Sequence, residues 1–264
     1  MRILLCGVFL LLTAGLFSDP LIEMLDVEGG TFQMGNTKPK YTGLYLHKVT
    51  ISSFRMGRTE VTQAQFKAVM GVNPSRFQDG TEAPQRPVEG VTWYMAVIFC
   101  NKLSAREGLS PAYRFEGTEV KWDRKANGYR LPTEGEWNWA AQGGRKSKGY
   151  RFIGGNDPGK LAWSDLNAGG TTHPVATKLP NELGFFDMGG NAAEWCWDWD
   201  GPYPKTAVQD PTGPDLGEAK ITRGDFAWDA GFTYEHNVPN PDQQISDSTD
   251  GGNNTGSGFR VVLP

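Results

Sequence analysis

The sequence predicts a loop-rich α+β fold and argues against a helical bundle. It holds 34 glycines, 17 prolines and nine tryptophans in 264 residues, a mix typical of irregular segments held by aromatic side chains. Short runs rich in β-branched residues alternate with segments of helical spacing that begin at threonine caps. Short strands, a few helices and long connections are therefore expected.

The first third of the chain is expected to form two strands and a helix. Residues 19–27 are interpreted as a lead-in. Residues 28–35 alternate between glycines and predict a short strand, and the β-branched run at 47–56 predicts a second. The capping box at 62–65 predicts the start of a helix, because its threonine and glutamine satisfy free backbone N–H groups. A Pro/Gly-rich loop follows over 71–91.

The longest helix is expected to begin at Thr92. Apolar residues follow at helical spacing, and Gly108 is a suitable end because glycine tolerates the left-handed conformation. A short strand is predicted at 120–122. A second capping box at 133–136, directly after a proline, predicts another helix that stops before Gly143.

The second half predicts little regular structure beyond short strands over 145–222. Trp195, Trp197 and Trp199 alternate, so they would point to one face of an extended segment, where core packing is expected rather than a sugar-stacking platform. The last strand, 258–262, lacks polar alternation and is expected to be central in its sheet.

The first 18 residues resemble a targeting signal. Met1 and Arg2 precede an apolar run of about 15 residues, too short for a comfortable membrane span. The mature protein is therefore expected to be exported, as a single domain over residues 19–264. Cys6 leaves a lipoprotein signal open beside a plain cleaved one. The net charge of −4 gives no general attraction to nucleic acid or anionic lipid, so membrane attachment is expected through a lipid anchor only.

Two cysteines remain in the mature chain, Cys100 and Cys196. In an exported protein they could form a disulfide. Two buried thiols are an equal alternative, because spacing along the chain says nothing about their separation in space.

Seven motifs occur in one order along the chain. They are GGTFQMG (29–35), EVTQAQF (60–66), PVEGVTW (87–93), GYRLPTEGEW (128–137), NELGFFDMGGNAAEW (181–195), RGD (223–225) and GFRVV (258–262). With this set, residues 25–264 resemble the formylglycine-generating enzyme, or sulfatase-modifying factor, family. The resemblance implies a variant of the C-type lectin fold, with a small twisted antiparallel sheet, two main helices and much irregular structure.

The resemblance does not extend to the family's catalytic groups. Its enzymes hold copper with a pair of cysteines that follow the RGG-type motif, and a related branch binds iron through histidines. The matching stretch, 225–236, has no cysteine, and His47, His173 and His236 form no pair at ligand spacing. A non-catalytic chain is therefore expected. A divergent oxidoreductase of this family and a structural lipoprotein are the alternatives.

A third branch of the family fits better, the variable proteins of diversity-generating retroelements, including treponemal members. In that branch the C-terminal segment is diversified and displayed for ligand binding. Here residues 223–264 hold two arginines, no lysine and six acids, with aromatic residues set among Asp, Asn, Ser, Thr and Gly. Such a mix is typical of binding surfaces. A solvated loop without a ligand is the alternative.

The expected ligand contacts divide into two chemical classes. Aromatic side chains would supply apolar area, and polar side chains would supply directed hydrogen bonds. The aromatic set is Phe226, Trp228, Phe232 and Tyr234. The polar set is Asp225, Asp229, His236, Asn237, Asp247, Thr249, Asp250, Asn253 and Asn254. An invariant scaffold is expected at Arg223, Gly224, Gly258, Phe259 and Arg260. The ligand itself is expected to be a protein or another surface macromolecule and not a nucleic acid.

The resemblance also implies a structural calcium ion, and no other cofactor is required. Its ligands would be Asp187, Gly190, Ala192 and Glu194, an oxygen set of the kind that calcium prefers. Local capping or pairing of the two acids is an equal alternative. Three further polar residues are expected in helix capping and buried pairing, Arg130, Glu134 and Glu136. His173 is expected to be a plain loop residue.

Overall fold

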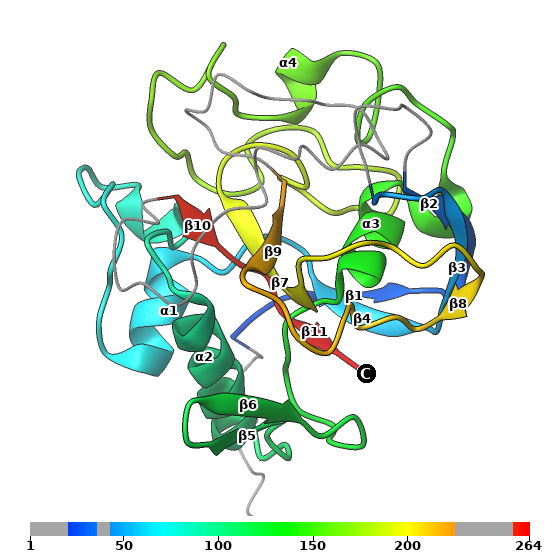
Figure 1. Ribbon diagram of the computed structural model, residues 1–264. Helices are drawn as coiled ribbons and strands as arrows, with labels where there is room; N and C mark the ends of the chain where they lie inside the picture. Colours follow the sequence, from blue (N-terminus) through cyan, green and yellow to red (C-terminus); the bar gives the residue numbers. More distant parts are fainter. Residues whose placement is uncertain (1–20, 36–42, 225–255) are drawn as a thin grey trace, which may run out of the picture.

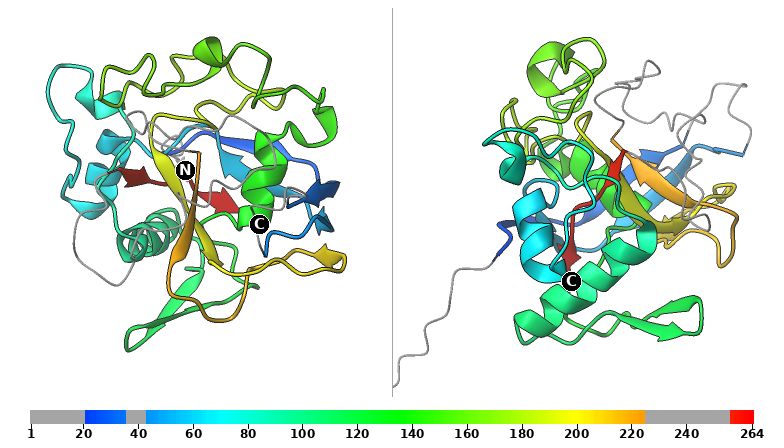
Figure 2. Two further views of the ribbon diagram at one scale, coloured as in Figure 1. Left: turned by 45° about the horizontal axis from the view of Figure 1, so that its top comes forward. Right: turned by 90° about the vertical axis from the view of Figure 1, so that its left-hand side faces the viewer.

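The computed structural model describes residues 21–35, 43–224 and 256–264. Helices α1 (Gln63–Met70) and α2 (Trp93–Arg106) lie on one side of the molecule, and α3 (Glu134–Ala141) lies toward the other (Figures 1 and 2). Short strands lie between these helices, beyond α3 and below α2 (Figure 1). Long connections and the single-turn helix α4 (Pro158–Leu161) lie at one end of the molecule. Within the described ranges, no helix is both long and apolar enough to cross a membrane.

The strands form three small sheets and a hairpin. Their bounds are β1 Met24–Val27, β2 Gly30–Met34, β3 His47–Ile51, β4 Phe54–Gly57, β5 Tyr113–Glu116, β6 Glu119–Trp122, β7 Ala193–Trp199, β8 Val208–Gln209, β9 Lys220–Arg223, β10 Ser257–Gly258 and β11 Val262–Leu263. The sheet orders are β1-β4-β11, β2-β3-β8 and β10-β7-β9, and β5 pairs with β6. Most of these pairings are antiparallel, but β8 and β10 run parallel to their partners. Two 3-10 turns complete the structure, η1 Ala83–Gln85 and η2 Gly144–Lys146.

The three predicted helix starts are confirmed, because each rests on local chemistry. Thr62, Thr92 and Thr133 all have extended backbones, and each side chain accepts the N–H three residues later. Capping boxes close at the first and third of these helices. Losing such a cap typically costs about 1 kcal/mol.

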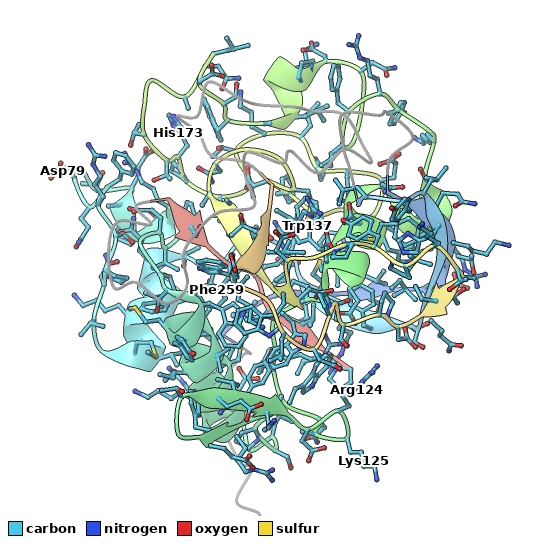
Figure 3. All side chains as sticks on the ribbon, viewed as in Figure 1. Asp79, Arg124, Lys125, Trp137, His173 and Phe259 are labelled. Carbon is cyan, nitrogen blue, oxygen red and sulfur yellow. The ribbon has the colours of Figure 1, made fainter. Side chains whose placement is uncertain are left out.

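Two apolar clusters fill the interior. One surrounds α1 and α2, where the rings of Phe66, Phe99 and Phe259 are in mutual contact at centroid distances of 5.1 to 6.2 Å. The other lies between α3 and strands β2 to β4 and includes Trp137 and Met56. Figure 3 places Trp137 and Phe259 inside the molecule. Burying each such side chain contributes roughly 1.5–3 kcal/mol.

Two strand expectations in the N-terminal third are wrong. The expected lead-in contains β1, which pairs with β4 so that Leu25 lies opposite Met56. The single strand expected over 47–56 is two strands, β3 and β4, that belong to different sheets. The break occurs at Ser52, whose backbone N–H and hydroxyl both donate to the Asp210 carboxylate, each at 2.7 Å. That partner lies far along the chain, so local pattern could not reveal the break.

The end of the chain is buried as expected, but it is not one central strand. Residues 257–263 are all buried, yet they divide into β10 and β11, each at the edge of its own sheet. Val262 pairs with β4 on one side and forms an isolated bridge with Arg130 on the other. Burial therefore comes from neighbours on both sides rather than from a long ladder of backbone hydrogen bonds.

The smaller expectations have mixed outcomes. Cys100 and Cys196 are free, buried thiols, so the disulfide alternative is wrong. Trp195 is buried, and the Trp197 ring stacks on Tyr113 at 5.1 Å, as core packing requires. His173 does more than fill a loop, because its ring stacks on another aromatic ring, that of Trp163, at 3.7 Å.

Candidate functional site

The two ends of the predicted ligand-binding segment are neighbours in one sheet. Strand β9 lies on one side of β7 and β10 on the other, so Glu194 pairs with Arg223 on one side and with Gly258 on the other. Adjacent strands are separated by about 4.8 Å, which places the two ends about 10 Å apart. We call the described part of the domain the frame. The chain leaves the frame after Gly224 and returns to it by Ser257, and both points lie beside the same residues of β7 (Figure 1).

The predicted contact residues themselves lie outside the described residues. This applies to every aromatic and polar candidate between 225 and 254, so their roles stay a prediction. The scaffold residues expected at either end of the segment are described. Each end is held by one ion pair, Arg260 with Glu194 at the return end and Arg223 with Glu134 at the departure end.

The return-end pair consists of Arg260 and Glu194. Both side chains are fully buried, and the guanidinium binds the carboxylate through two atoms, with Nε–Oε2 at 2.6 Å and Nη2–Oε1 at 2.5 Å. Arg260 also donates to the carbonyls of Gly57 and Phe186, and Trp137 Nε1 donates to Glu194 Oε2 at 2.7 Å. Such two-point, charge-assisted geometry fixes orientation as well as distance.

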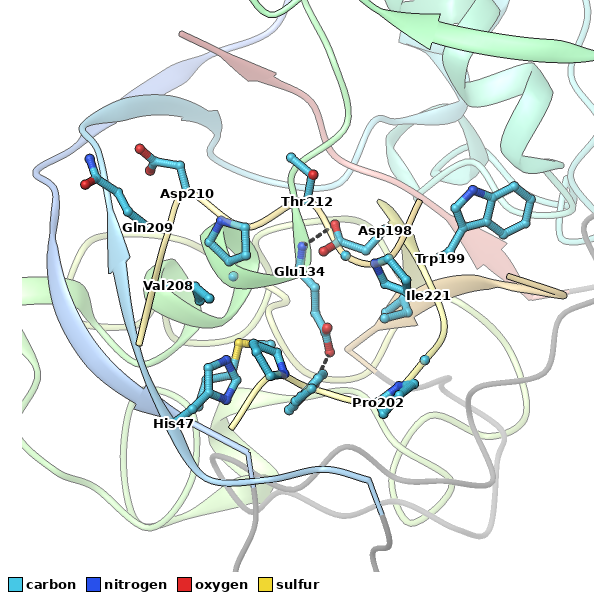
Figure 4. A pocket seen from close by; sticks show the side chains of 18 residues that line it. His47, Glu134, Asp198, Trp199, Pro202, Val208, Gln209, Asp210, Thr212 and Ile221 are labelled. Atoms are coloured by element: carbon cyan, nitrogen blue, oxygen red, sulfur yellow. Dashed lines mark hydrogen bonds between the residues drawn. The ribbon is translucent and has the colours of Figure 1, made fainter. Parts of the chain in front are cut away.

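The departure-end pair consists of Arg223 and Glu134, which lies in the first turn of α3. Tyr203 completes the group. Its hydroxyl donates to Glu134 Oε1 at 2.5 Å (Figure 4). The same hydroxyl accepts from Arg223 Nη2 at 3.0 Å. Helix α3 is itself held by Arg130, which binds Glu136 at 2.6 and 2.7 Å. The expected capping and pairing roles of Arg130, Glu134 and Glu136 are thereby confirmed.

Gly224 forms the junction between frame and segment. Its φ of +98° is in the left-handed region, where a side chain would strain the backbone. Its carbonyl accepts the N–H of Gly190. The backbone conformation thus gives a physical reason for the predicted scaffold role of this glycine.

The two carboxylates of the predicted calcium set differ in whether their oxygens already have hydrogen-bond partners. Asp187 Oδ2 accepts from the Ala176 N–H at 2.8 Å, while its buried Oδ1 has no hydrogen-bond partner. The Glu194 carboxylate is already bound by Arg260 and Trp137. Burial raises the pKa of Asp187 to about 6, against the opposing effects of the Ala176 N–H, Arg260 and Lys178. The donor set therefore fits a hard cation at Asp187 and fits it poorly at Glu194.

Glu60 is a further member of this cluster that the sequence does not single out. It is buried, its Oε1 accepts from the Ala192 N–H at 3.3 Å, and its Oε2 has no partner. Desolvation raises its pKa, and the nearby Asp187 and Glu194 raise it further. Across the described part of the chain, no three His, Cys, Asp or Glu side chains are grouped closely enough to hold a metal ion. Backbone carbonyls would therefore have to complete any calcium site.

The two described thiols are poorly placed for redox chemistry. Cys100 and Cys196 are both fully buried, and burial raises the pKa of each thiol well above its ordinary value. The thiolate is the form that binds metals and reacts, so both groups are held in the inert form.

Comparison with known proteins identifies relatives over most of the chain. Residues 16–263 match the family model of the sulfatase-modifying factor enzyme 1-like domain. Chaperone protein LppX of Paenibacillus barcinonensis is 40% identical over 209 residues, covering 67% of this chain and 71% of that protein. The formylglycine-generating enzyme of Streptomyces coelicolor is 28% identical over 237 residues, covering 74% and 76% respectively.

A solved structure confirms the fold class and the predicted branch of resemblance. Treponema denticola variable protein 1 superposes with a TM-score of 0.80 at 33% identity, and the match covers 91% of this chain and 94% of that one. The fold is therefore the expected C-type lectin-like variant, with small sheets, few helices and much irregular structure.

Proposed function

Because the chain belongs to the sulfatase-modifying factor enzyme 1-like family, we propose that it is a non-catalytic ligand-binding member whose C-terminal region, 223–264, is diversified to vary its specificity. The observation that carries the proposal is the sheet β10-β7-β9. It holds both ends of the predicted binding segment at one level, each end fixed by an ion pair to Glu194 or Glu134. The similarity to a treponemal variable protein supports it.

The sheet β10-β7-β9 is a suitable base for a binding segment whose side chains vary while the rest of the domain stays the same. The charged side chains that hold the segment point into the protein, so substitution between 225 and 254 leaves them intact. Trp228, Phe232 and Tyr234 would supply rigid contact area, and the Asp, Asn and Thr side chains would supply adaptable hydrogen bonds. A base with fixed ends also lowers the ordering cost of binding.

Sequence and burial together support the proposal of a non-catalytic chain. No cysteine follows Cys196, and both thiols of the described chain are buried with raised pKa. The purified protein should therefore carry no stoichiometric copper or iron by plasma mass spectrometry. Stoichiometric redox metal would favour the divergent oxidoreductase instead.

The proposed site of action is outside the cell. The apolar run within residues 1–18 supports export, with either a cleaved signal or a lipid anchor at Cys6. Mass spectrometry of the mature N-terminus distinguishes the two, because a lipidated cysteine adds the mass of its acyl chains. Light scattering tests the structural-lipoprotein alternative, which requires a size that grows with concentration.

We also propose that Asp187 binds a structural calcium ion together with the carbonyls of Gly190 and Ala192. The unpartnered Oδ1 of Asp187 supports this assignment. The ion would supply positive charge to a buried cluster of acids. Glu194, the fourth residue of the predicted set, would stay paired with Arg260 beside the ion.

The decisive experiment for diversification is sequencing of the genomic DNA beside the gene. A near-copy of the last ~130 nucleotides, next to a reverse transcriptase gene and differing only at adenines of the copy, would establish the variable positions directly. A flanking region without such a copy would remove retroelement diversification and leave a binding protein of fixed specificity.

A further inference from the structure

A cavity of about 550 Å³ lies beside the departure-end pair, within the part of the chain that the structure describes. It is enclosed by the start of α3, the connection from β7 to β9, and His47 of β3 (Figure 4). Glu134 and Tyr203 form part of its wall, so it adjoins the frame rather than the segment 225–254. Its volume is in the range of small-molecule sites.

Most of the wall is rigid and apolar. Pro202, Pro204, Pro211 and Pro214 line it together with the rings of Trp199 and Tyr203. Proline and aromatic side chains have few rotatable bonds, so a ligand that packs on them orders little of the protein. The wall therefore fits a compact apolar or aromatic body.

The charged side chains in the described wall of the cavity are all acidic. Glu134, Asp198 and Asp210 line the cavity, and no lysine or arginine is among its described lining residues. Glu134 is paired with Arg223, and Asp210 is bound by Ser52.

Asp198 is the lining acid for which the described residues supply no ion pair. Its Oδ2 accepts the backbone N–H of Glu134 at 2.9 Å. The nearest lysine, Lys220, donates instead to the Trp197 carbonyl at 2.8 Å and lies 3.8 Å from the Trp199 ring centroid.

His47 adds a second acceptor to the wall. Its Nδ1 lies 2.9 Å from the Tyr45 carbonyl, so the hydrogen is on Nδ1 and Nε2 is left as an acceptor. The ring rests against Tyr203 at 5.4 Å. A ligand with hydrogen-bond donors and positive charge matches these groups, and a carboxylate or phosphate does not.

We propose that this cavity binds a small organic cation, a primary ammonium joined to an aromatic or apolar body. The ammonium lies at Asp198, and the body packs on the prolines, Trp199 and Tyr203. This site is formed by frame residues, so it is independent of the ligand-binding function proposed for residues 225–254.

The surroundings of Asp198 make the binding depend on pH. Burial and, to a lesser extent, the Glu136 carboxylate of α3 raise the pKa of Asp198, Lys220 of β9 and Arg130 oppose this, and the net pKa is about 8. Glu134 and Tyr203 also border the cavity. A cation requires the ionised carboxylate, while an aliphatic amine stays charged to about pH 10. Affinity for the cation should therefore increase as the pH rises through 8.

The test is calorimetric titration of the full chain with three probes of one shape: phenethylamine, 2-phenylethanol and 3-phenylpropionate. We expect the amine to bind about tenfold more tightly than the alcohol, and the acid to bind least. Asp198→Asn keeps an acceptor for the Glu134 N–H and should weaken amine binding by about tenfold. Asp200→Asn, a nearby acid outside the cavity wall, should change it by less than about twofold.

A second variant keeps the test sharp if Asp198→Asn is poorly folded. Thr212→Phe fills the cavity from its loop side and should abolish amine binding with an unchanged unfolding temperature. Equal binding of amine and acid, full affinity in either variant, or no binding of any probe would overturn the proposal. A Trp228→Ala/Tyr234→Ala chain should bind phenethylamine normally, which separates this site from the proposed one.

Discussion

The two ends of the segment 225–254 are held by the same chemistry in different surroundings. At the return end, Arg260 and Glu194 are completely buried, and the guanidinium also binds two backbone carbonyls. At the departure end, the Arg223 side chain is 11% exposed, and its partner Glu134 borders a cavity. The difference shows that the return end is sealed inside the core, whereas the departure end lies beside a cavity.

The largest expected effect is loss of the return-end pair. Arg260→Met leaves Glu194 as a buried charge without its cation, which should cost about 3–5 kcal/mol of unfolding free energy. Urea unfolding measures this. Arg58→Met, which breaks the exposed pair with Glu23, should cost less than about 1 kcal/mol. Similar losses in the two variants would contradict the structural role of Arg260.

Calcium bound at Asp187 should stabilise the folded chain. At a concentration 100 times its dissociation constant, an ion that binds only the folded state adds about 2.7 kcal/mol. The unfolding temperature should therefore rise with calcium and fall with EDTA, and Asp187→Ala should remove the response. Exposed Asp26→Ala is the control. An unfolding temperature that is the same in calcium and EDTA would rule the ion out.

The departure-end pair should contribute less to the free energy of unfolding than the return-end pair. Glu134→Gln keeps the shape of the side chain and the contact with Tyr203 but removes the charge facing Arg223. We expect a loss of roughly 1–3 kcal/mol in urea unfolding. A loss equal to that of Arg260→Met would mean that the two ends do not differ.

Asp198 should impose a pH dependence on stability near the departure end. Its folded pKa of about 8 is above the unfolded value of about 3.9, so the folded state holds a proton that the unfolded state releases between these two pH values. Its contribution to stability is present below pH 4 and is lost as the pH rises to 8, by at most about 1.4 kcal/mol per pH unit.

Asp198→Asn removes this loss. The stability of the variant relative to the natural chain should therefore increase steadily when urea unfolding is repeated from pH 5 to pH 8. A difference that stays constant across that range would contradict the raised pKa of Asp198.

Features that depend on neighbouring residues were predictable from the sequence. Thr62, Thr92 and Thr133 predict helix starts because each side chain accepts the backbone N–H of the residue three positions later. The order of motifs likewise predicted the fold class and the family, and both are confirmed.

Features that depend on distant partners were not predictable. Strand β1 exists because β4 pairs with it, and the break at Ser52 exists because Asp210 binds there. The contacts of Tyr203 and Glu60 likewise join segments far apart in the chain. Tyr203 lies in none of the seven motifs, and Glu60 opens the motif at 60–66 without a role that the motif reveals. The hydroxyl and the carboxyl gain their contacts only when the sheets assemble.

The smallest expected effect tests the central claim most directly, that Trp228 and Tyr234 belong to a binding segment and not to the frame. The measurement is thermal unfolding of the Trp228→Ala/Tyr234→Ala chain beside Trp195→Ala, whose side chain is buried in the frame. We predict an unfolding temperature within about 1 °C of the natural chain for the double variant. Trp195→Ala should lose about 3–5 kcal/mol. A comparable loss in the double variant would make Trp228 and Tyr234 core residues and contradict the account.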